Sequence, residues 1–203
     1  MSKFCSHCNK EYSDDFVFCP YCGKNLDDSM ESEKWDYLLE IFETRRLRFG
    51  RYNDEEIVWD PKTMINNCVL LVADDILACG KFDEKSCDWN DSEIRRWLNN
   101  DFYNEAFNET EKKFIGDYLC GDKVFLLSAQ EFYQYCPEDE RIKKGTIGAK
   151  KQGLWVYTKG YSCWWLRSSD GTYVDRVDDI GGVTSFFPNS SHVGIVPAIL
   201  LKI

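Results

Sequence analysis

The chain has 203 residues, of which 43% are hydrophobic and 15% aromatic, and its 25 Lys and Arg against 35 Asp and Glu give a formal net charge of -10. This composition supplies enough apolar surface for one domain of ordinary size and a small additional one, and it excludes collagen-like, coiled-coil and low-complexity proteins. The negative balance disfavours nonspecific binding to nucleic acid, because the phosphate backbone repels it.

The N-terminal residues lack the apolar run of a secretory signal peptide. The longest apolar stretches, residues 69–73 and 193–201, are shorter than the roughly 20 residues of a membrane span. We therefore expect a cytoplasmic protein that does not bind membranes. In a reducing compartment, the 10 Cys residues are expected to be metal ligands or buried thiols rather than disulfides.

Four cysteines near the N-terminus form two Cys-x-x-Cys pairs, Cys5 with Cys8 and Cys19 with Cys22. A two-residue gap lets one turn present both sulfurs to a single ion, so the pairs predict a zinc site with four thiolate ligands. Because the thiolates fill all four positions, the zinc is expected to be structural. The alternative, a pair of redox motifs, lacks the βαβ context of a thioredoxin-like protein.

The segment from Phe4 to Leu26 resembles the small zinc ribbons of many prokaryotic proteins, and FCPYCGKNL is typical of their second knuckle. Such ribbons contact nucleic acid or protein. Acidic residues outnumber lysines in this one, so a protein partner is expected. The acidic sequence that follows predicts a flexible linker, which divides the chain into a ribbon (1–27), a linker (28–33) and a main domain (34–203).

The main domain is expected to open with an amphipathic helix in residues 33–46. Its strands are predicted from short apolar runs bounded by turn residues. These runs are residues 47–52, 56–59, 68–73, 124–127, 163–167, 173–177, 183–187 and 193–201. Helices grouped between two sets of strands indicate an α+β fold rather than a parallel doubly wound sheet.

The predicted helices in the middle of this domain are marked by capping-box spacing, in which a polar residue precedes Glu by three positions. The pairs are Asn90 with Glu93, Asn108 with Glu111, and Ser128 with Glu131. Residues 136–160 are rich in charge, Gly and Lys, and we expect a mobile, loop-rich stretch there without assignable chemistry.

Several motifs after Leu47 resemble an uncharacterised bacterial domain family of the C-type-lectin-like fold, related in architecture to formylglycine-generating enzymes. The motifs are FGRY, S-x-I-R-x-W-L-N, VFLLS-x-x-E, WWLRS and a closing G-I-V-P-A-I-L. The resemblance covers residues 47–203 and implies a small N-terminal zinc ribbon followed by a C-type-lectin-like domain. That family usually closes with G-V-R-P-A, whereas this chain has Val196 in place of the arginine.

The resemblance also implies a scaffold whose C-terminal strands and loops display a recognition surface. The residues expected to bind a ligand there are Tyr173, Asp175, Arg176, Asp178, Phe186, Asn189 and His192, which combine aromatic and polar groups that suit binding. Asp175, Asp178, Asp179 and Asn189 are a candidate set of calcium ligands. The alternative is that these are ordinary core and solvent-facing residues of strands.

Two functions remain open at this point. The first, which we favour, is a non-enzymatic adaptor whose ribbon contacts a protein and whose lectin-like domain recognises a protein or a small ligand. The second is an enzyme that uses a cysteine thiol on a formylglycine-generating-enzyme-like fold, with Cys163 and His192 as a candidate pair. Cys163 precedes two tryptophans in an apolar run, where a thiol is usually buried and inert.

Overall fold

The computed structural model describes residues 2–4, 11–13, 46–157 and 159–202 of the chain. The chain forms two compact units, Met1–Glu43 and Thr44–Ile203. In the first unit, β1 (Ser2–Phe4) pairs antiparallel with β2 (Glu11–Ser13). The four cysteines predicted to bind zinc, the linker at 28–33 and the helix predicted at 33–46, whose last residue alone is described, lie outside these described residues.

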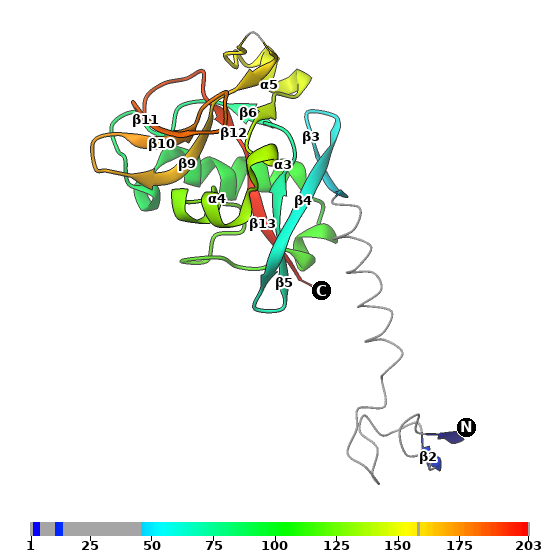
Figure 1. Cartoon of the computed structure of the whole chain (residues 1–203). Coiled ribbons are helices and arrows are strands. Elements are labelled where there is room, and N and C mark those ends of the chain that lie inside the picture. Colours follow the sequence, from blue (N-terminus) through cyan, green and yellow to red (C-terminus); the bar gives the residue numbers. More distant parts are fainter. Residues whose placement is uncertain (1, 5–10, 14–45, 158, 203) are drawn as a thin grey trace. The chain divides into compact units, whose positions relative to one another are not determined.

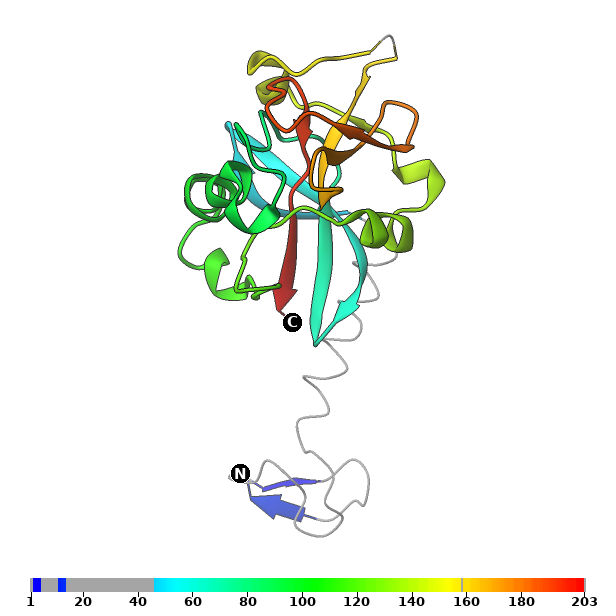
Figure 2. The same cartoon turned by 90° about the vertical axis from the view of Figure 1, so that its left-hand side faces the viewer.

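Two sheets form the centre of the second unit (Figures 1 and 2). The first has the order β13-β5-β4-β3, and all its neighbouring strands are antiparallel. Its strands are β3 (Leu47–Tyr52), β4 (Glu55–Ile65), β5 (Cys68–Ala73) and β13 (Ala198–Lys202). The predictions for β3 and β5 are confirmed to the residue, and β4 is longer than predicted.

The second sheet has the order β11-β10-β9-β12-β6. The antiparallel meander of β9, β10 and β11 confirms the predicted C-terminal strands, whereas β12 runs parallel to β9. The strands are β6 (Ala78–Cys79), β9 (Trp164–Ser169), β10 (Val174–Val177), β11 (Val183–Phe186) and β12 (Gly194–Ile195). A separate ribbon pairs β7 (Lys143–Lys144) with β8 (Tyr161–Ser162).

Two-residue turns connect β3 to β4 and β4 to β5. Asn53 and Asp54 form the first turn, Asn66 and Asn67 form the second, and all four have positive φ angles, between 48° and 63°. Asn and Asp tolerate this conformation, and turns of this kind match the right-handed twist of the strands they join. These turns therefore set the register next to them, and an irregularity shifts it farther along each strand pair, between Arg48 and Arg51 and between Pro61 and Thr63.

The strand predicted at 193–201 is divided between the two sheets. β12 pairs with β6 and β9 in the second sheet, and β13 pairs with β5 in the first. Val196 and Pro197 lie between β12 and β13, and proline has no N–H to continue a ladder. At Gly194, an added Cβ would lie 2.5 Å from the Ile76 side chain, so only glycine allows this close approach.

A continuous helical segment packs beside the sheets. It consists of α2 (Glu93–Trp97), a π-helical turn η2 (Leu98–Phe102) and α3 (Tyr103–Ala106). The predicted cap at Asn90 is wrong: Ser92 accepts the capping hydrogen bond from Arg95 N. Asn90 instead belongs to the preceding turn η1 (Trp89–Asp91), where Asp88 accepts a hydrogen bond from its backbone N–H.

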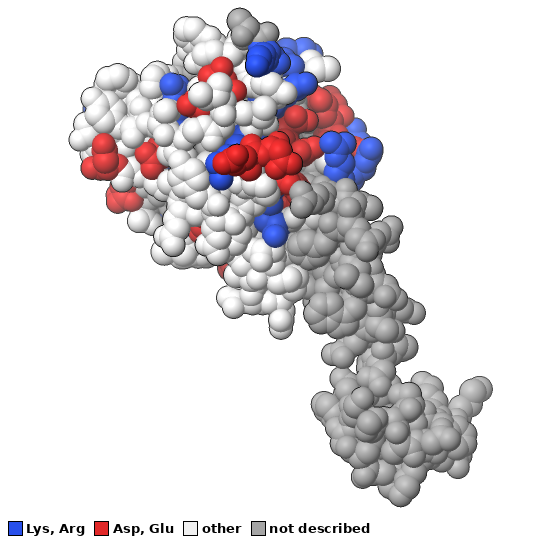
Figure 3. All heavy atoms as spheres, viewed as in Figure 1, with Lys and Arg blue, Asp and Glu red and all other residues white. Residues whose placement is uncertain are grey.

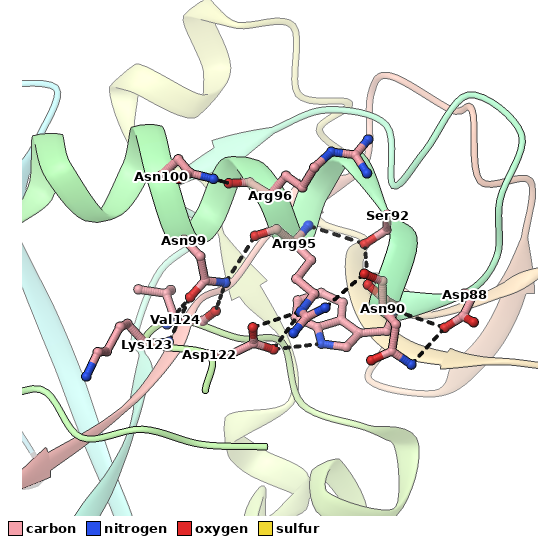
Figure 4. Close-up of polar contacts among 11 residues, drawn as sticks. Asp88, Asn90, Ser92, Arg95, Arg96, Asn99, Asn100, Asp122, Lys123 and Val124 are labelled. Carbon is pink, nitrogen blue, oxygen red and sulfur yellow. Dashed lines mark hydrogen bonds and ion pairs between the residues drawn. The ribbon is translucent and has the colours of Figure 1, made fainter. Parts of the chain in front are cut away.

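Polar side chains join this helical segment to the loop at residues 122–124 (Figure 4). Arg95 Nε donates to both carboxylate oxygens of Asp122, at 2.8 and 2.9 Å, and Trp89 Nε1 donates to the same carboxylate at 3.0 Å. Asn99 donates to the carbonyls of Arg95 and Val124. The R-x-W-L-N motif therefore has a structural role. The side-chain amide of Asn99 donates to a backbone carbonyl in the widened turn of the helix.

The other two capping predictions fare differently. Asn108 and Glu111 exchange reciprocal hydrogen bonds, but the element that begins at Glu111 is only a 3-10 turn, η3 (Glu111–Phe114). Ser128 and Glu131 form a full capping box at α4 (Ala129–Tyr135), which confirms that prediction. The strand predicted at residues 124–127 is wrong: this buried segment makes a single bridge to β13, at Phe125, before α4 begins.

Residues 136–160 are more regular than predicted. They include η4 (Glu138–Glu140), β7 and α5 (Ile147–Lys151), which Thr146 caps through its hydroxyl. The unit is thus a mixed helix-and-sheet fold, as predicted. Among the residues that the structure describes, no helix has the length and apolar character needed to cross a membrane.

A buried ion pair joins α4 to β9. The two terminal guanidinium nitrogens of Arg167, Nη1 and Nη2, donate to the carboxylate of Glu131. The Tyr118 hydroxyl donates to the same carboxylate. Burial would raise the pKa of Glu131, but hydrogen bonds from Arg167, Tyr118 and the Ser128 N–H outweigh it and lower that pKa. The S-x-x-E and W-L-R-S motifs are therefore two halves of one structural contact.

Replacing Glu131 with Gln is expected to lower the free energy of unfolding by about 3 kcal/mol at neutral pH, because Arg167 is left buried without its carboxylate. The folded-state pKa of Glu131 is lowered, so its contribution is complete above the ordinary pKa of glutamate. The contribution is lost as the pH falls through the folded-state value. Urea unfolding followed by tryptophan fluorescence measures this difference from neutral to acidic pH.

The matched control is Glu56→Gln, which removes an exposed ion pair with Arg48 and is expected to change stability by less than about 1 kcal/mol. Equal unfolding midpoints for Glu131→Gln and the unmodified chain would contradict this account of the ion pair.

Candidate ligand-binding site

A pocket of about 210 Å³ lies beside the β9–β11 meander. Its walls come from four parts of the main unit: the segment after α5, the residue between β8 and β9, the strands β10 and β11, and the loop before β12. We call it the aromatic pocket. The residues that line it are Trp155, Tyr157, Cys163, Arg176, Phe186, Ser190, His192 and Val193.

The segment after α5 supplies two stacked aromatic rings. The centroids of Trp155 and Tyr157 lie 6.3 Å apart, with 23° between the ring planes. Trp155 is 65% exposed, although the burial of so large an aromatic side chain would contribute much free energy to folding. Its backbone N–H donates to the carbonyl of His192 at 3.1 Å, which ties this segment to the loop before β12. The aromatic wall is therefore held in place while its surface remains open.

Arg176 provides the cation of the pocket. On β10 it lies opposite Thr184, so its diagonal neighbour on β11 is Phe186. Arg176 Cζ lies 3.6 Å from the centre of the Phe186 ring, a cation–π contact. Within the described part of the chain, the buried Nε of Arg176 has no hydrogen-bond partner. A buried donor without a partner is costly, and a ligand that accepts from it removes that cost.

The loop before β12 supplies His192. Its Nδ1 lies 2.9 Å from the carbonyl oxygen of Gly153, and because a carbonyl only accepts, Nδ1 is the donor. In the neutral imidazole this leaves Nε2 as an acceptor. Gly153 has a φ of +101°, which only glycine adopts without strain, so the chain turns here between α5 and Trp155.

Cys163 lines the same pocket as His192, but the two form no hydrogen bond with each other in the described structure. The Cys163 thiol donates to the Tyr157 hydroxyl at 3.7 Å. Burial raises the pKa of Cys163, with a further increase from the negative charges of Asp179 and Asp178. The hydrogen bond with Tyr157 and the charge of Arg176 oppose this change but do not reverse it. The thiol is therefore protonated at neutral pH and weakly nucleophilic.

Of the seven residues predicted to bind a ligand, Arg176, Phe186 and His192 line the aromatic pocket. The other four do not line it. Tyr173 packs edge-to-face on Phe187, with centroids 5.0 Å apart. Asp175 accepts a hydrogen bond from the Ser185 hydroxyl, and Asp178 accepts from the Ile180 and Gly182 N–H groups in the turn before β11. Asn189 is exposed.

The candidate calcium ligands do not converge. Among the residues that the structure describes, no three His, Cys, Asp or Glu side chains are arranged to hold a metal ion. Asp178 is occupied by turn amides and Asp175 by a hydroxyl, so each carboxylate has a structural partner.

Trp155 and Tyr157 are functional candidates that the sequence prediction missed, because they lie in the stretch expected to carry no chemistry. The signal for them is the alternation of large side chains in G-L-W-V-Y just after α5. Such an aromatic pair in a polar stretch is expected either to enter a core or to form a binding surface.

Charge on the main unit is mixed. In Figure 3, acidic and basic side chains are interspersed on the face shown, and the part over β9–β11 is mainly uncharged with a few acidic side chains. The described residues on this face therefore form no broad patch of one charge.

The comparisons with known proteins place the main unit in a family. Residues 66–203 match the family described as "Domain of unknown function (DUF6273)". The chain belongs to this family. Residues 4–26 match a zinc-ribbon domain, which confirms the predicted ribbon and includes all four predicted thiolate ligands. No curated protein and no solved structure shows significant similarity to the chain, so the lectin-like fold stays a prediction.

The zinc-ribbon match predicts the metal content of the protein. The purified full chain is expected to contain about one zinc ion, and Cys22→Ser is expected to lose it, because three thiolates hold zinc less tightly than four. Elemental analysis measures the zinc. Cys120→Ser is the matched control, since Cys120 is an exposed cysteine of the main unit. Equal zinc content in the two variants would contradict the predicted site.

The Cys163 environment predicts slow chemical modification. In the native chain, iodoacetamide is expected to label Cys163 much more slowly than the exposed Cys120, because Cys163 is buried and its pKa is raised. Peptide mass spectrometry measures both rates, and the two cysteines are expected to react similarly after denaturation. Labelling of Cys163 ahead of Cys120 in the native state would instead favour the thiol enzyme.

Proposed function

We propose that the protein is a cytoplasmic, non-enzymatic binding protein whose main unit recognises a ligand at the aromatic pocket, while its zinc ribbon contacts a protein partner. One observation carries the proposal for the pocket: Arg176, whose buried Nε has no hydrogen-bond partner among the described residues, lines a cavity with aromatic walls. Ligand sites are typically concave and mostly apolar, with a few polar groups that set orientation.

The C-type-lectin-like architecture is part of this proposal. In support, the last strand, β13, pairs along its length with β5, so the closing segment returns to the start of the DUF6273 region. The β9–β11 meander lies beyond this pairing and carries the aromatic pocket, as the resemblance implies for a recognition surface.

The pocket is organised before a ligand arrives. Trp155 is fixed to the backbone of His192, His192 to the backbone of Gly153, and Arg176 to the Phe186 ring. Binding to such a site requires little ordering of side chains, so more of the contact energy is available as affinity. The Cys163 thiol also supports a binding role, because its pKa is raised, whereas the pKa of an activated nucleophilic thiol is lowered.

A screen by ligand-observed NMR tests the proposed site with the full chain and a library of neutral, cationic and anionic small molecules. At least one compound is expected to bind the unmodified protein and to lose about tenfold or more in affinity with Phe186→Ala, because the variant removes one wall and the support of Arg176.

Phe114→Ala is the matched control, because Phe114 is a half-exposed phenylalanine that does not line the aromatic pocket. It is expected to bind the same compound as tightly as the unmodified chain. If every compound that binds is unaffected by Phe186→Ala, or if none binds, the aromatic pocket is not the recognition site.

A further inference from the structure

We infer that the aromatic pocket takes a small aromatic monocarboxylate, with the carboxylate on Arg176 and the ring among Phe186, Trp155 and Tyr157. This inference rests on the proposed function and names the chemical class of its ligand.

The carboxylate of the ligand is inferred from the environment of Arg176. Its guanidinium lies at the pocket, and among the described residues no acidic side chain accepts a hydrogen bond from its buried Nε, although the chain has an excess of acidic residues. A carboxylate matches the planar fork of a guanidinium and accepts two hydrogen bonds at once. Such charge-assisted bonds are roughly twice as strong as neutral ones. A bound carboxylate therefore satisfies the cation that the fold leaves unpaired.

The aromatic ring of the ligand is inferred from the aromatic side chains that line the pocket. Phe186 supports the guanidinium on one side, and the stacked pair of Trp155 and Tyr157 contributes a second aromatic surface. An aromatic ring packs on such surfaces in offset or edge-to-face geometry, with a gain beyond its buried area. The volume of about 210 Å³ lies below the range of about 300–1,000 Å³ for pockets that hold drug-sized molecules. A ligand with a single ring therefore fits best.

We infer that the ligand carries one negative charge rather than two from the acidic residues that follow β10. Asp178 and Asp179 follow the pocket residue Arg176 by two and three positions, directly after the end of β10. Asp178 is held by the N–H groups of Ile180 and Gly182, so it remains near the pocket. These carboxylates repel a second negative charge on a ligand. A monocarboxylate is therefore favoured over a phosphate monoester, which is mostly doubly charged at neutral pH.

Titration of the full chain with three probes tests this inference: benzoate, its neutral isostere benzamide, and phenyl phosphate. The Nε–H cross-peak of Arg176 in proton–nitrogen NMR spectra is the readout, because a buried Nε–H exchanges slowly with water. Benzoate is expected to shift this peak in a saturable way and to bind about tenfold more tightly than benzamide. Phenyl phosphate is expected to bind more weakly than benzoate.

Variants separate charge from geometry. Arg176→Gln is expected to abolish the preference for benzoate over benzamide, and Arg176→Lys, which keeps the charge but not the planar fork, is expected to retain part of it. Arg48→Gln is the matched control, since Arg48 is an exposed arginine on β3. It is expected to bind benzoate as the unmodified chain does.

The outcomes distinguish this inference from the proposed function. Equal affinity for benzoate and benzamide, both lost with Phe186→Ala, overturns the carboxylate and leaves the pocket as a binding site. Benzoate binding that Arg176→Gln does not change, stronger binding of phenyl phosphate, or no benzoate binding also overturns the inference. Only the failure of the library screen with Phe186→Ala overturns the proposed site itself.

Discussion

The closing segment, from β12 to β13, is the constraint on which the main unit depends. Within a few residues the chain pairs with β9 and β6 in one sheet and with β5 in the other. The two sheets therefore cannot move independently without breaking one of these pairings. The same segment positions the candidate site, because His192 and Val193 of the aromatic pocket immediately precede β12. The scaffold and the site are thus parts of one continuous stretch of chain.

Most buried cations of the unit have a polar partner within the fold: three pair with carboxylates, and Lys143 donates to the carbonyl of Asp74. Arg95 pairs with Asp122, Arg167 with Glu131, and Lys62 with Asp60 and Glu140. Each of these three cations pairs with a carboxylate distant in sequence, and breaking that pair leaves a charge without compensation. Arg176 has an aromatic ring as its described contact instead. This contrast is the physical reason to assign the paired arginines to the fold and Arg176 to a ligand.

Local signals made much of the fold predictable. The strands β3 and β5 and the capping box at Ser128 depend on neighbouring residues, so alternation, turns and cap spacing identify them. The wrong predictions arise where two residues compete for one position, or where a segment depends on a partner that is distant in sequence. Asn90 has the spacing of a cap, but Ser92 takes that place. The apolar run at 124–127 has the composition of a strand, yet periodicity does not reveal that it lacks a partner along its length.

The candidate site was less predictable than the fold. Arg176, Phe186 and His192 were expected from their position in the C-terminal strands and loops, and they meet at one pocket. Asp175 and Asp178 looked like ligand residues because they are polar, but a serine hydroxyl and turn amides use their carboxylates. Trp155 and Tyr157 come from a segment before the β9–β11 meander. Their role depends on contacts across the fold, such as that of Trp155 with His192, which no local pattern encodes.

The central claim is that the fold holds Arg176 unpaired in an aromatic pocket for a ligand carboxylate. A crystal structure of the full chain with benzoate bound tests this most directly. The account predicts the carboxylate against the Arg176 guanidinium, the ring between Phe186 and Trp155, and no acidic side chain on Arg176 in crystals without benzoate. An ion pair between Arg176 and Asp178 or Asp179 in the free protein, or benzoate bound elsewhere, would contradict it.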